Sequence, residues 1–427
     1  MHNYLARIKK LQKIISKESL SAFLVTNKTN ILYLSGFSSS NGFLLITKQK
    51  SILFTDSRYI EEARYKIPKF FKLMDIKKIW DNTFLTNNSP KSKTAHKRQS
   101  ENSWQKLLKN LKIKSLGFEG DSITYNRLKK YKKISPKIKF EDISGKIETL
   151  RAIKDPYEIS LIKKGQKINE KVFLEIEKLI KTHLIQSKIH GFKNTKKTSK
   201  AKSPTTKPLR EIDLVWEIKR LGFEYGAEAI SFEPIVAFGK HTSQPHHTSD
   251  KTKLKKGDIV LIDMGMKYKG YCSDMTRMIF TAPMTKQQRE VYYTVLGAQE
   301  RAISQIKPNV FEQEIDTTAR SYIKSRKYGK FFTHGTGHGV GLDIHESPSF
   351  RESTNSHEEN QPKTSKKNLK NNKNKTSSKD TSLKKLLPGM IVTVEPGIYL
   401  PGKFGIRIED MILITKKGNT NITNIQK

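Results

Sequence analysis

Two carboxylates stand on a pair of apolar segments that have the composition of β-strands. Asp263 lies in segment 258–264 (DIVLIDM), and Asp274 lies in segment 271–280 (YCSDMTRMIF). If these segments form an antiparallel hairpin that turns at Tyr268-Lys269, the two carboxylates face each other, with Cβ atoms roughly 4.5–5.5 Å apart. Opposed carboxylates repel each other unless a cation neutralises them. The spacing therefore predicts a metal site.

The same pattern recurs near the end of the chain. Glu395 follows segment 390–394 (MIVTV), and Glu409 lies in segment 405–415 (GIRIEDMILIT). The two residues are equally distant from Gly402, which lies in a Pro-Gly-Lys turn signal. The alternative is an exposed sheet face, or ion pairs between these acids and Arg277 and Arg407. Two carboxylate pairs on apolar strands favour the metal site over that alternative.

A glycine-rich segment, 334–346 (HGTGHGVGLDIHE), holds three histidines: His334, His338 and His345. Its glycines suit a loop where the backbone passes close to a ligand. Four carboxylates and one imidazole form an oxygen-rich ligand set, which suits two divalent ions such as Mn(II), with Zn, Co or Fe as rivals. A fourth histidine, His246, follows Pro245, and its local context predicts only a loop.

Alternating strand and helix patterns surround these residues. The first part of the chain, up to about residue 147, predicts an α/β layer domain with strands at 21–26, 42–47, 51–55 and 115–119 and helices at 58–66 and 122–132. A long helix over 156–181 opens a second domain. Further helices are predicted at 211–221, 286–306 and 311–326.

The composition narrows the class of protein. The 427 residues carry a formal net charge of +40, part of which lies in three lysine-rich stretches of linker composition, 86–103, 185–208 and 351–385. Aromatic residues do not interleave with these lysines, so nucleic-acid binding is not favoured. A single cysteine excludes a disulfide framework. Without a long apolar run or a signal-peptide pattern, we expect a cytoplasmic protein with no membrane contact.

Several segments together resemble a known family. The similarity to the dinuclear pita-bread metallopeptidases, and within them to the Xaa-Pro aminopeptidase and proline dipeptidase branch, rests on segments 245–247 (PHH), 262–265 (IDMG), 270–277 (GYCSDMTR), 334–346, 394–399 (VEPGIY) and 405–410 (GIRIED). Segments 33–37 (YLSGF) and 53–59 (LFTDSRY) resemble the creatinase-type N-terminal domain of that branch. The resemblance implies an α+β protein, with a creatinase-type domain over 1–147 and a pita-bread metallopeptidase domain over 148–427.

The resemblance also implies the roles of the site residues. The metal ligands would be Asp263, Asp274, His338, Glu395 and Glu409, with Asp274 and Glu409 bridging both ions. Glu395 would also move a proton. The resemblance places His246, His334 and His345 near the scissile carbonyl, puts Arg407 beside the site, and makes Tyr399 a pocket candidate. We expect Cys272 to be a buried structural residue rather than a ligand.

The implied reaction is metal-dependent hydrolysis of the peptide bond before proline. We expect an Xaa-Pro aminopeptidase, which releases the N-terminal residue from proline-containing peptides. The alternatives are an Xaa-Pro dipeptidase restricted to dipeptides and, less favoured, a non-catalytic pita-bread binding protein. A homodimer or higher homo-oligomer is expected from the resemblance.

Overall fold

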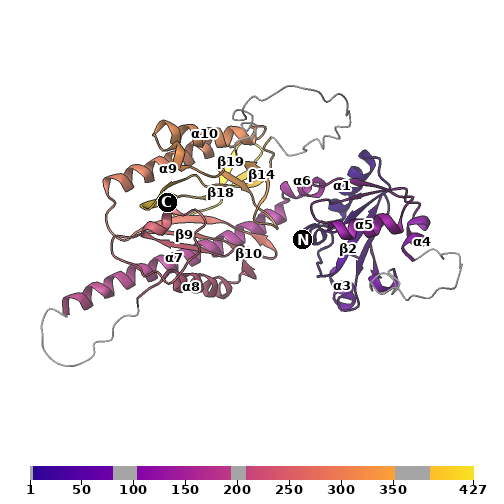
Figure 1. Ribbon diagram of the computed structural model, residues 1–427, viewed down its shortest axis with the longest axis horizontal. Helices are drawn as coiled ribbons and strands as arrows, with labels where there is room; N and C mark the ends of the chain where they lie inside the picture. The colour runs from indigo at the N-terminus through magenta and orange to yellow at the C-terminus, as the bar shows by residue number, and fades with distance from the viewer. Residues whose placement is uncertain (1–2, 80–102, 194–207, 352–384) are drawn as a thin grey trace, which may run out of the picture. The chain divides into compact units, whose positions relative to one another are not determined.

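The computed structural model describes residues 3–79, 103–193, 208–351 and 385–427. The chain divides into two compact units, Met1–Arg151 and Ala152–Lys427 (Figure 1). The lysine-rich stretches predicted at 86–103, 185–208 and 351–385 lie for the most part outside the described residues. The described start of the second stretch is helical, because helix α7 (Pro156–Lys193) continues well beyond the predicted end at residue 181.

The N-terminal unit is built on one six-stranded sheet with the order β4-β3-β2-β1-β5-β6. Its strands are β1 (Ala22–Val25), β2 (Gly42–Thr47), β3 (Ser51–Thr55), β4 (Phe71–Asp75), β5 (Ser115–Phe118) and β6 (Lys139–Asp142). The four central strands confirm the predicted ones. The two edge strands were not predicted, because β4 and β6 are only partly buried and lack an apolar run.

Helices α1 (Tyr4–Lys17), α2 (Lys28–Ser35), α3 (Ile60–Lys66), α4 (Ser103–Asn110), α5 (Tyr125–Ile134) and α6 (Lys146–Ala152) complete this unit. Its core is closed by aromatic contacts between the sheet and α4. The rings of Phe43 and Phe54 stack with centroids 4.5 Å apart, and the fully buried Trp104 meets both edge-on. These aromatic contacts pack α4 against the sheet, as expected for a helix that covers the sheet of an α/β domain.

In its described residues, the second unit combines four α-helices with small, antiparallel sheets. The helices are α7, α8 (Glu211–Glu224), α9 (Lys286–Gln305) and α10 (Glu312–Ser325). The strands are β7 (Ala229–Ile230), β8 (Ile235–Phe238), β9 (Ile259–Met264), β10 (Met266–Tyr268), β11 (Tyr271–Cys272), β12 (Met275–Phe280), β13 (Gly337–Gly339), β14 (Glu346–Phe350), β15 (Ile391–Val394), β16 (Gly397–Leu400), β17 (Phe404–Arg407), β18 (Asp410–Ile414) and β19 (Asn419–Asn421).

Two helix pairs enclose these strands, as Figure 1 shows. Apolar residues of α7 and α8 form one core with the β12-β9-β8 sheet. Apolar residues of α9 and α10 form a second core with strands β15, β17 and β18. The predicted α+β class is confirmed, and so are the helices predicted at 211–221, 286–306 and 311–326. Within the described residues, no helix combines the length and apolar character that a membrane span requires.

The first predicted hairpin has a different register from the one expected. Strand β9 pairs with β12 so that Asp263 lies opposite Thr276, not opposite Asp274. The turn falls at Lys269-Gly270, where both residues have positive φ, 47° and 81°. Two central residues in this conformation match the right-handed twist of a tight hairpin. Because the register differs by two residues, Asp263 and Asp274 still share one face, diagonally rather than directly.

The second hairpin has the predicted register. Val394 pairs with Asp410 on one side, and Gly397 pairs with Arg407 on the other. Glu395 and Glu409 therefore occupy opposed positions at the junction of these two pairings. The turn is centred on Gly402, whose φ is +71°, a conformation that glycine adopts without strain.

Candidate active site

Five predicted ligands come from three parts of the second unit. Asp263 lies on β9, Asp274 immediately precedes β12, and His338 lies on β13, while Glu395 and Glu409 meet at the second hairpin. Ligand atoms of Asp274, His338 and Glu409 lie within 4.8 Å of one another. The Nε2 atom of His338 is 3.7 Å from Oδ2 of Asp274 and 3.4 Å from Oε1 of Glu395. The fold thus brings distant segments to one point.

Three of these carboxylates each have one buried oxygen that no described residue satisfies. Among the described residues, the buried oxygens Asp263 Oδ1, Asp274 Oδ1 and Glu409 Oε1 have no hydrogen-bond partner. A buried, unsatisfied carboxylate oxygen is costly, and a divalent cation removes that cost by direct coordination. The three orphaned oxygens therefore fit a metal site.

The ionisation of the cluster points the same way. Burial, together with the charges of neighbouring carboxylates, raises the pKa values of Asp274 and Glu409 well above their usual range. Burial also raises the pKa of Glu395 to about 7. A bound cation would stabilise the ionised forms of these acids, which repel one another without it.

His338 is prepared as a neutral ligand. Its Nδ1–H donates to the carbonyl oxygen of Gly339 at 3.0 Å, so Nε2 presents its lone pair to the carboxylates. Burial lowers the pKa of His338, which favours the neutral form. A histidine whose second ring nitrogen is held in this way has its tautomer and orientation fixed for metal binding.

Arg407 and Thr276 form hydrogen bonds to two of the carboxylates, those of Asp263 and Glu409. The Nη2 atom of Arg407 donates to Oδ2 of Asp263 at 2.6 Å, and its Nε donates to Oγ1 of Thr276 at 3.1 Å. The Thr276 hydroxyl in turn donates to Oε2 of Glu409 at 2.7 Å. Arg407 therefore lies beside the candidate site and holds Asp263 in place; its role in the reaction stays a prediction. Thr276 was missed by the sequence prediction, because a buried threonine on a strand has no distinctive pattern.

Tyr399 links Arg407 to His334. Its hydroxyl accepts from Nη1 of Arg407 at 2.8 Å and donates to Nε2 of His334 at 2.9 Å. The Nδ1–H of His334 is bound by the carbonyl oxygen of Gly335 at 2.8 Å. Burial and the Arg407 charge lower the pKa of His334 to about 4, so this imidazole is neutral at physiological pH.

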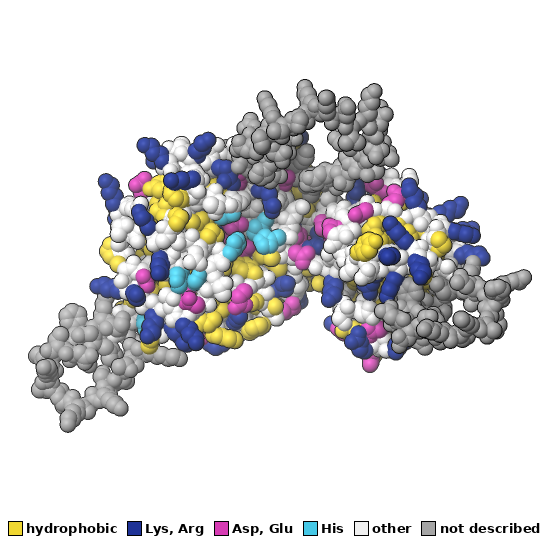
Figure 2. All heavy atoms as spheres, in the orientation of Figure 1, with side chains coloured by type: hydrophobic (Ala, Val, Ile, Leu, Met, Phe, Trp, Pro, Cys, Tyr) yellow, Lys and Arg dark blue, Asp and Glu magenta, His cyan; other side chains and the backbone are white. Residues whose placement is uncertain are grey.

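The other two predicted histidines lie at the same site. The ring of His345 is 4.4 Å from the ring of His338, centroid to centroid, and the residue is exposed. His246 is exposed, and its charge affects the pKa values of Glu395 and His334. Figure 2 shows histidine side chains gathered on one face of the second unit, while lysine and arginine side chains are scattered. The nine residues predicted for the site, counting Arg407 with the five ligands and three histidines, therefore lie in one neighbourhood.

Cys272 is not among the candidate ligands. Its side chain is fully buried, and its Sγ lies 3.6 Å from the carbonyl oxygen of Leu342. Burial raises the pKa of this thiol to about 11, so the thiolate needed for metal binding is disfavoured. The predicted structural role agrees with this environment.

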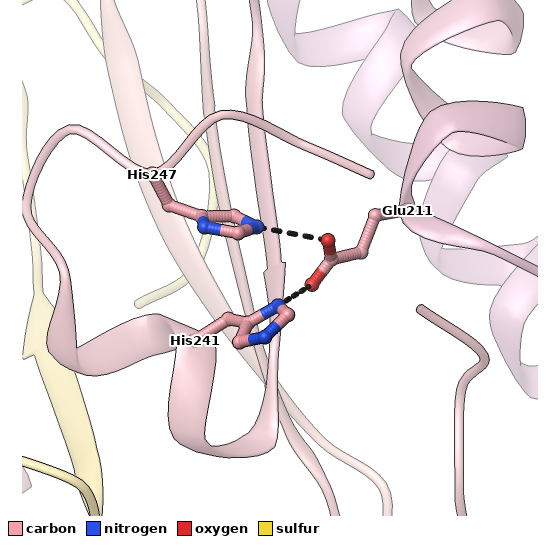
Figure 3. A group of neighbouring side chains, drawn as sticks. All are labelled: Glu211, His241 and His247. Carbon is pink, nitrogen blue, oxygen red and sulfur yellow. Dashed lines mark hydrogen bonds and ion pairs between the residues drawn. The ribbon is translucent and has the colours of Figure 1, made fainter. Parts of the chain in front are cut away.

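A second group of potential ligands was missed. Glu211, His241 and His247 place ligand atoms within 4.8 Å of one another (Figure 3). The sequence prediction singled out none of them, because Glu211 lies far from the histidines along the chain. His241 and His247 flank the segment that carries His246.

Comparison with known proteins identifies the family. Residues 160–416 match metallopeptidase family M24, and residues 7–153 match the Creatinase/Prolidase N-terminal domain. The chain is 30% identical to an Xaa-Pro dipeptidase of Pyrococcus horikoshii, over 99% of this chain and 97% of the relative.

Solved structures give the same result. An Xaa-Pro dipeptidase from Bacillus anthracis matches with a TM-score of 0.75 and 30% identity, over 100% of this chain and 99% of that one. An X-Pro aminopeptidase from Thermotoga maritima matches with a TM-score of 0.71 and 26% identity, over 96% of each chain. The predicted architecture, a creatinase-type N-terminal domain followed by a pita-bread domain, is confirmed. This chain is a member of metallopeptidase family M24.

Proposed function

We propose that this chain is an Xaa-Pro dipeptidase that uses two divalent ions, with Mn(II) as the ion of choice. The observation that carries the proposal is the convergence of three orphaned, buried carboxylate oxygens beside the free Nε2 of His338. Our sequence-based preference was an aminopeptidase. Named relatives support the dipeptidase better, because close matches over nearly the whole chain are called Xaa-Pro dipeptidase.

The proposed ligands are the predicted set, namely Asp263, Asp274, His338, Glu395 and Glu409. Carboxylate oxygens and one imidazole suit Mn(II). When bound, two such ions supply Lewis-acid polarisation of the scissile carbonyl and a strong nucleophile near neutral pH.

The side chains of this protein then manage protons and orientation. The bond before proline is a tertiary amide, so the departing nitrogen must gain a proton. Glu395, whose Oε1 faces the ligand cluster, is proposed to hold that proton and transfer it to the nitrogen. His246 and His345 are proposed to donate hydrogen bonds to the carbonyl oxygen as it gains negative charge. Arg407 keeps Asp263 in position.

Substrate length tests the proposal. After reconstitution with Mn(II), we expect the protein to hydrolyse an Xaa-Pro dipeptide. The kcat/KM for an Xaa-Pro-Yaa tripeptide should be lower by a factor of at least about 100, since a dipeptidase site must exclude the extra residue. Equal hydrolysis of both peptides would instead establish the aminopeptidase. Hydrolysis of neither would refute both.

Two substitutions test the site. Asp263→Ala and Glu395→Ala should each abolish hydrolysis while the far-ultraviolet circular dichroism spectrum stays unchanged. Glu217→Gln is a matched control, because Glu217 forms only a surface ion pair with Arg220 at 2.7 Å. Full activity in either site variant would remove the basis of the assignment. The homodimer and the cytoplasmic location stay predictions.

A further inference from the structure

We propose that Glu211, His241 and His247 form a clamp that positions His246 for the reaction. This inference rests on the proposed function, since it assumes that His246 contacts the substrate. The three clamp residues themselves do not touch the reacting atoms; they are positioning residues.

The clamp is a buried carboxylate with four donors. Glu211 is fully buried at the first residue of α8. Its Oε1 accepts from Nδ1 of His241 at 3.0 Å and from the backbone N–H of Phe238 at 2.8 Å. Its Oε2 accepts from Nε2 of His247 at 2.8 Å and from the backbone N–H of Asp250 at 3.1 Å. Figure 3 shows both imidazoles directed at the carboxylate.

These bonds distinguish the clamp from a metal centre. Both carboxylate oxygens of Glu211 are already satisfied by N–H donors, whereas three oxygens of the Asp263–Asp274–Glu409 group have no partner among the described residues. A cation placed between Glu211 and the histidines would have to displace two N–H hydrogen bonds. The chemistry of the group therefore favours hydrogen bonding over coordination.

The clamp fixes the segment that carries His246. The short 3₁₀ helix Gly239–Ser243 and the residues that follow it lie between Phe238 and Asp250, whose backbone N–H groups both donate to Glu211. On one side of His246, the carbonyl oxygen of Pro245 accepts from Nη1 of Arg407 at 3.2 Å. On the other side, the buried His247 is bonded to Glu211. The backbone of His246 is thus anchored at both neighbouring residues, while its own side chain remains exposed.

Further contact joins this segment to the second hairpin. The hydroxyl of the buried Thr242 accepts from the backbone N–H of Gly405 at 2.8 Å. Strand β17 carries both Gly405 and Arg407. The segment that carries His246 is therefore fixed to the same strand that supplies the Arg407 bond to Asp263. Loosening the clamp is therefore expected to displace His246 relative to the ligands, and a displacement of about 1 Å can cost roughly 100-fold in rate.

A double-mutant cycle tests the positioning role. Glu211→Gln replaces one acceptor oxygen by an NH₂ group, which cannot accept from its N–H partner. We expect kcat for an Xaa-Pro dipeptide to fall about tenfold or more with little change in KM, because the loss is of transition-state contact. In a His246→Ala background the same substitution should have almost no further effect, since coupled sites are not additive. Glu217→Gln, on the same helix, should change neither parameter.

Conservative variants guard against misfolding. His247→Gln and His241→Asn each retain an N–H donor close to the original ring nitrogen, whereas His247→Ala and His241→Ala remove it. We expect the conservative variants to retain most of kcat and the alanine variants to lose it. Equal kcat in each conservative and alanine pair would overturn the inference. So would an equal effect of Glu211→Gln with and without His246.

Two measurements that do not use activity separate this inference from the proposed function. Hydrogen exchange should show faster exchange of backbone amides in 238–250 in Glu211→Gln, with exchange in β15 unchanged. Metal analysis should show the same number of bound Mn(II) ions in wild type and variant. Unchanged exchange, or loss of an ion in the variant, would overturn the clamp. A wild-type chain inactive on every Xaa-Pro peptide would defeat the proposed function instead.

Discussion

Thr276 gives the sharpest test of how the candidate ligands are held. Its hydroxyl donates to Oε2 of Glu409 at 2.7 Å and accepts from Nε of Arg407 at 3.1 Å, and its side chain is fully buried. Thr276→Val keeps the shape of the side chain and removes both hydrogen bonds. The substitution therefore leaves a carboxylate oxygen and a guanidinium N–H unsatisfied in the interior.

The size of the effect follows from these two bonds. The bond from the Arg407 guanidinium involves a charged group and contributes about 1.5–3 kcal/mol to stability, while the bond to Glu409, whose raised pKa favours the neutral acid without metal, contributes about 0.5–1.5 kcal/mol. The two bonds share one hydroxyl, and the new methyl group returns about 0.8 kcal/mol through its burial. We expect the free energy of unfolding to fall by about 3 kcal/mol. Affinity for Mn(II) should fall about 10–100-fold, the usual result of removing a partner that orients a metal ligand.

Urea denaturation of the metal-free protein and calorimetric titration with Mn(II) measure the two effects separately. Thr294→Val is the matched control. The Thr294 side chain is also buried, but its hydroxyl bonds only to the carbonyl oxygen of Glu290 within α9. This control should lose about 1 kcal/mol or less in stability and nothing in Mn(II) affinity.

The affinity measurement and the stability measurement test different claims about Thr276. Unchanged Mn(II) affinity in Thr276→Val would show that Glu409 needs no support from Thr276, or that Glu409 is not a ligand. An equal loss of stability in both threonine variants would show that the Thr276 bonds contribute no more than an ordinary buried hydroxyl.

Three further predictions concern charge and burial. Because burial raises the pKa of Glu395 to about 7 without metal, Mn(II) must displace protons; its affinity should rise from pH 6 to pH 8 in calorimetric titrations, and equal affinities would contradict this. Arg277→Met breaks a buried ion pair with Asp410 at 2.7 Å, so urea denaturation should show a loss of about 3–5 kcal/mol, and a loss below about 1 kcal/mol would argue against the pair. Cys272, with a pKa raised to about 11 by burial, should react with a thiol reagent only after unfolding, and rapid reaction of the native protein would contradict its burial.

Local pattern predicted much of the fold and most of the candidate site. The central strands of the N-terminal unit and the main helices of the second unit have strong apolar periodicity, which is why their positions were predictable. The register of the second hairpin was predictable because Pro401 and Gly402 mark its turn, and a Pro-Gly pair is a strong turn signal.

The first hairpin shows where local pattern fails. The turn falls at Lys269-Gly270, and a positive φ at Lys269 is not expected from its side chain. The register was therefore misplaced by two residues, which preserved the face of each strand but not the pairing. Asp263 could still be grouped with Asp274, because the side-chain period of a strand is two.

Contacts between segments far apart in the chain could not be predicted from the sequence. Thr276 binds a residue from another hairpin, and Glu211 binds histidines that follow it by 30 and 36 positions. Neither contact has a fixed spacing, because both depend on how α8, β12 and the second hairpin pack. The net charge of +40 did not point to the candidate site, because the site carboxylates are few in a basic chain and Asp263, Asp274 and Glu409 are buried.

The most direct measurement is the rate of Xaa-Pro dipeptide hydrolysis as Mn(II) is titrated into the metal-free chain, with bound ions counted in parallel. We predict that activity appears only as metal binds, reaches its maximum at two ions per chain, and is absent at every Mn(II) concentration in Asp274→Asn. Full hydrolysis in the presence of a chelator, or wild-type activity in Asp274→Asn, would contradict the proposed dinuclear site.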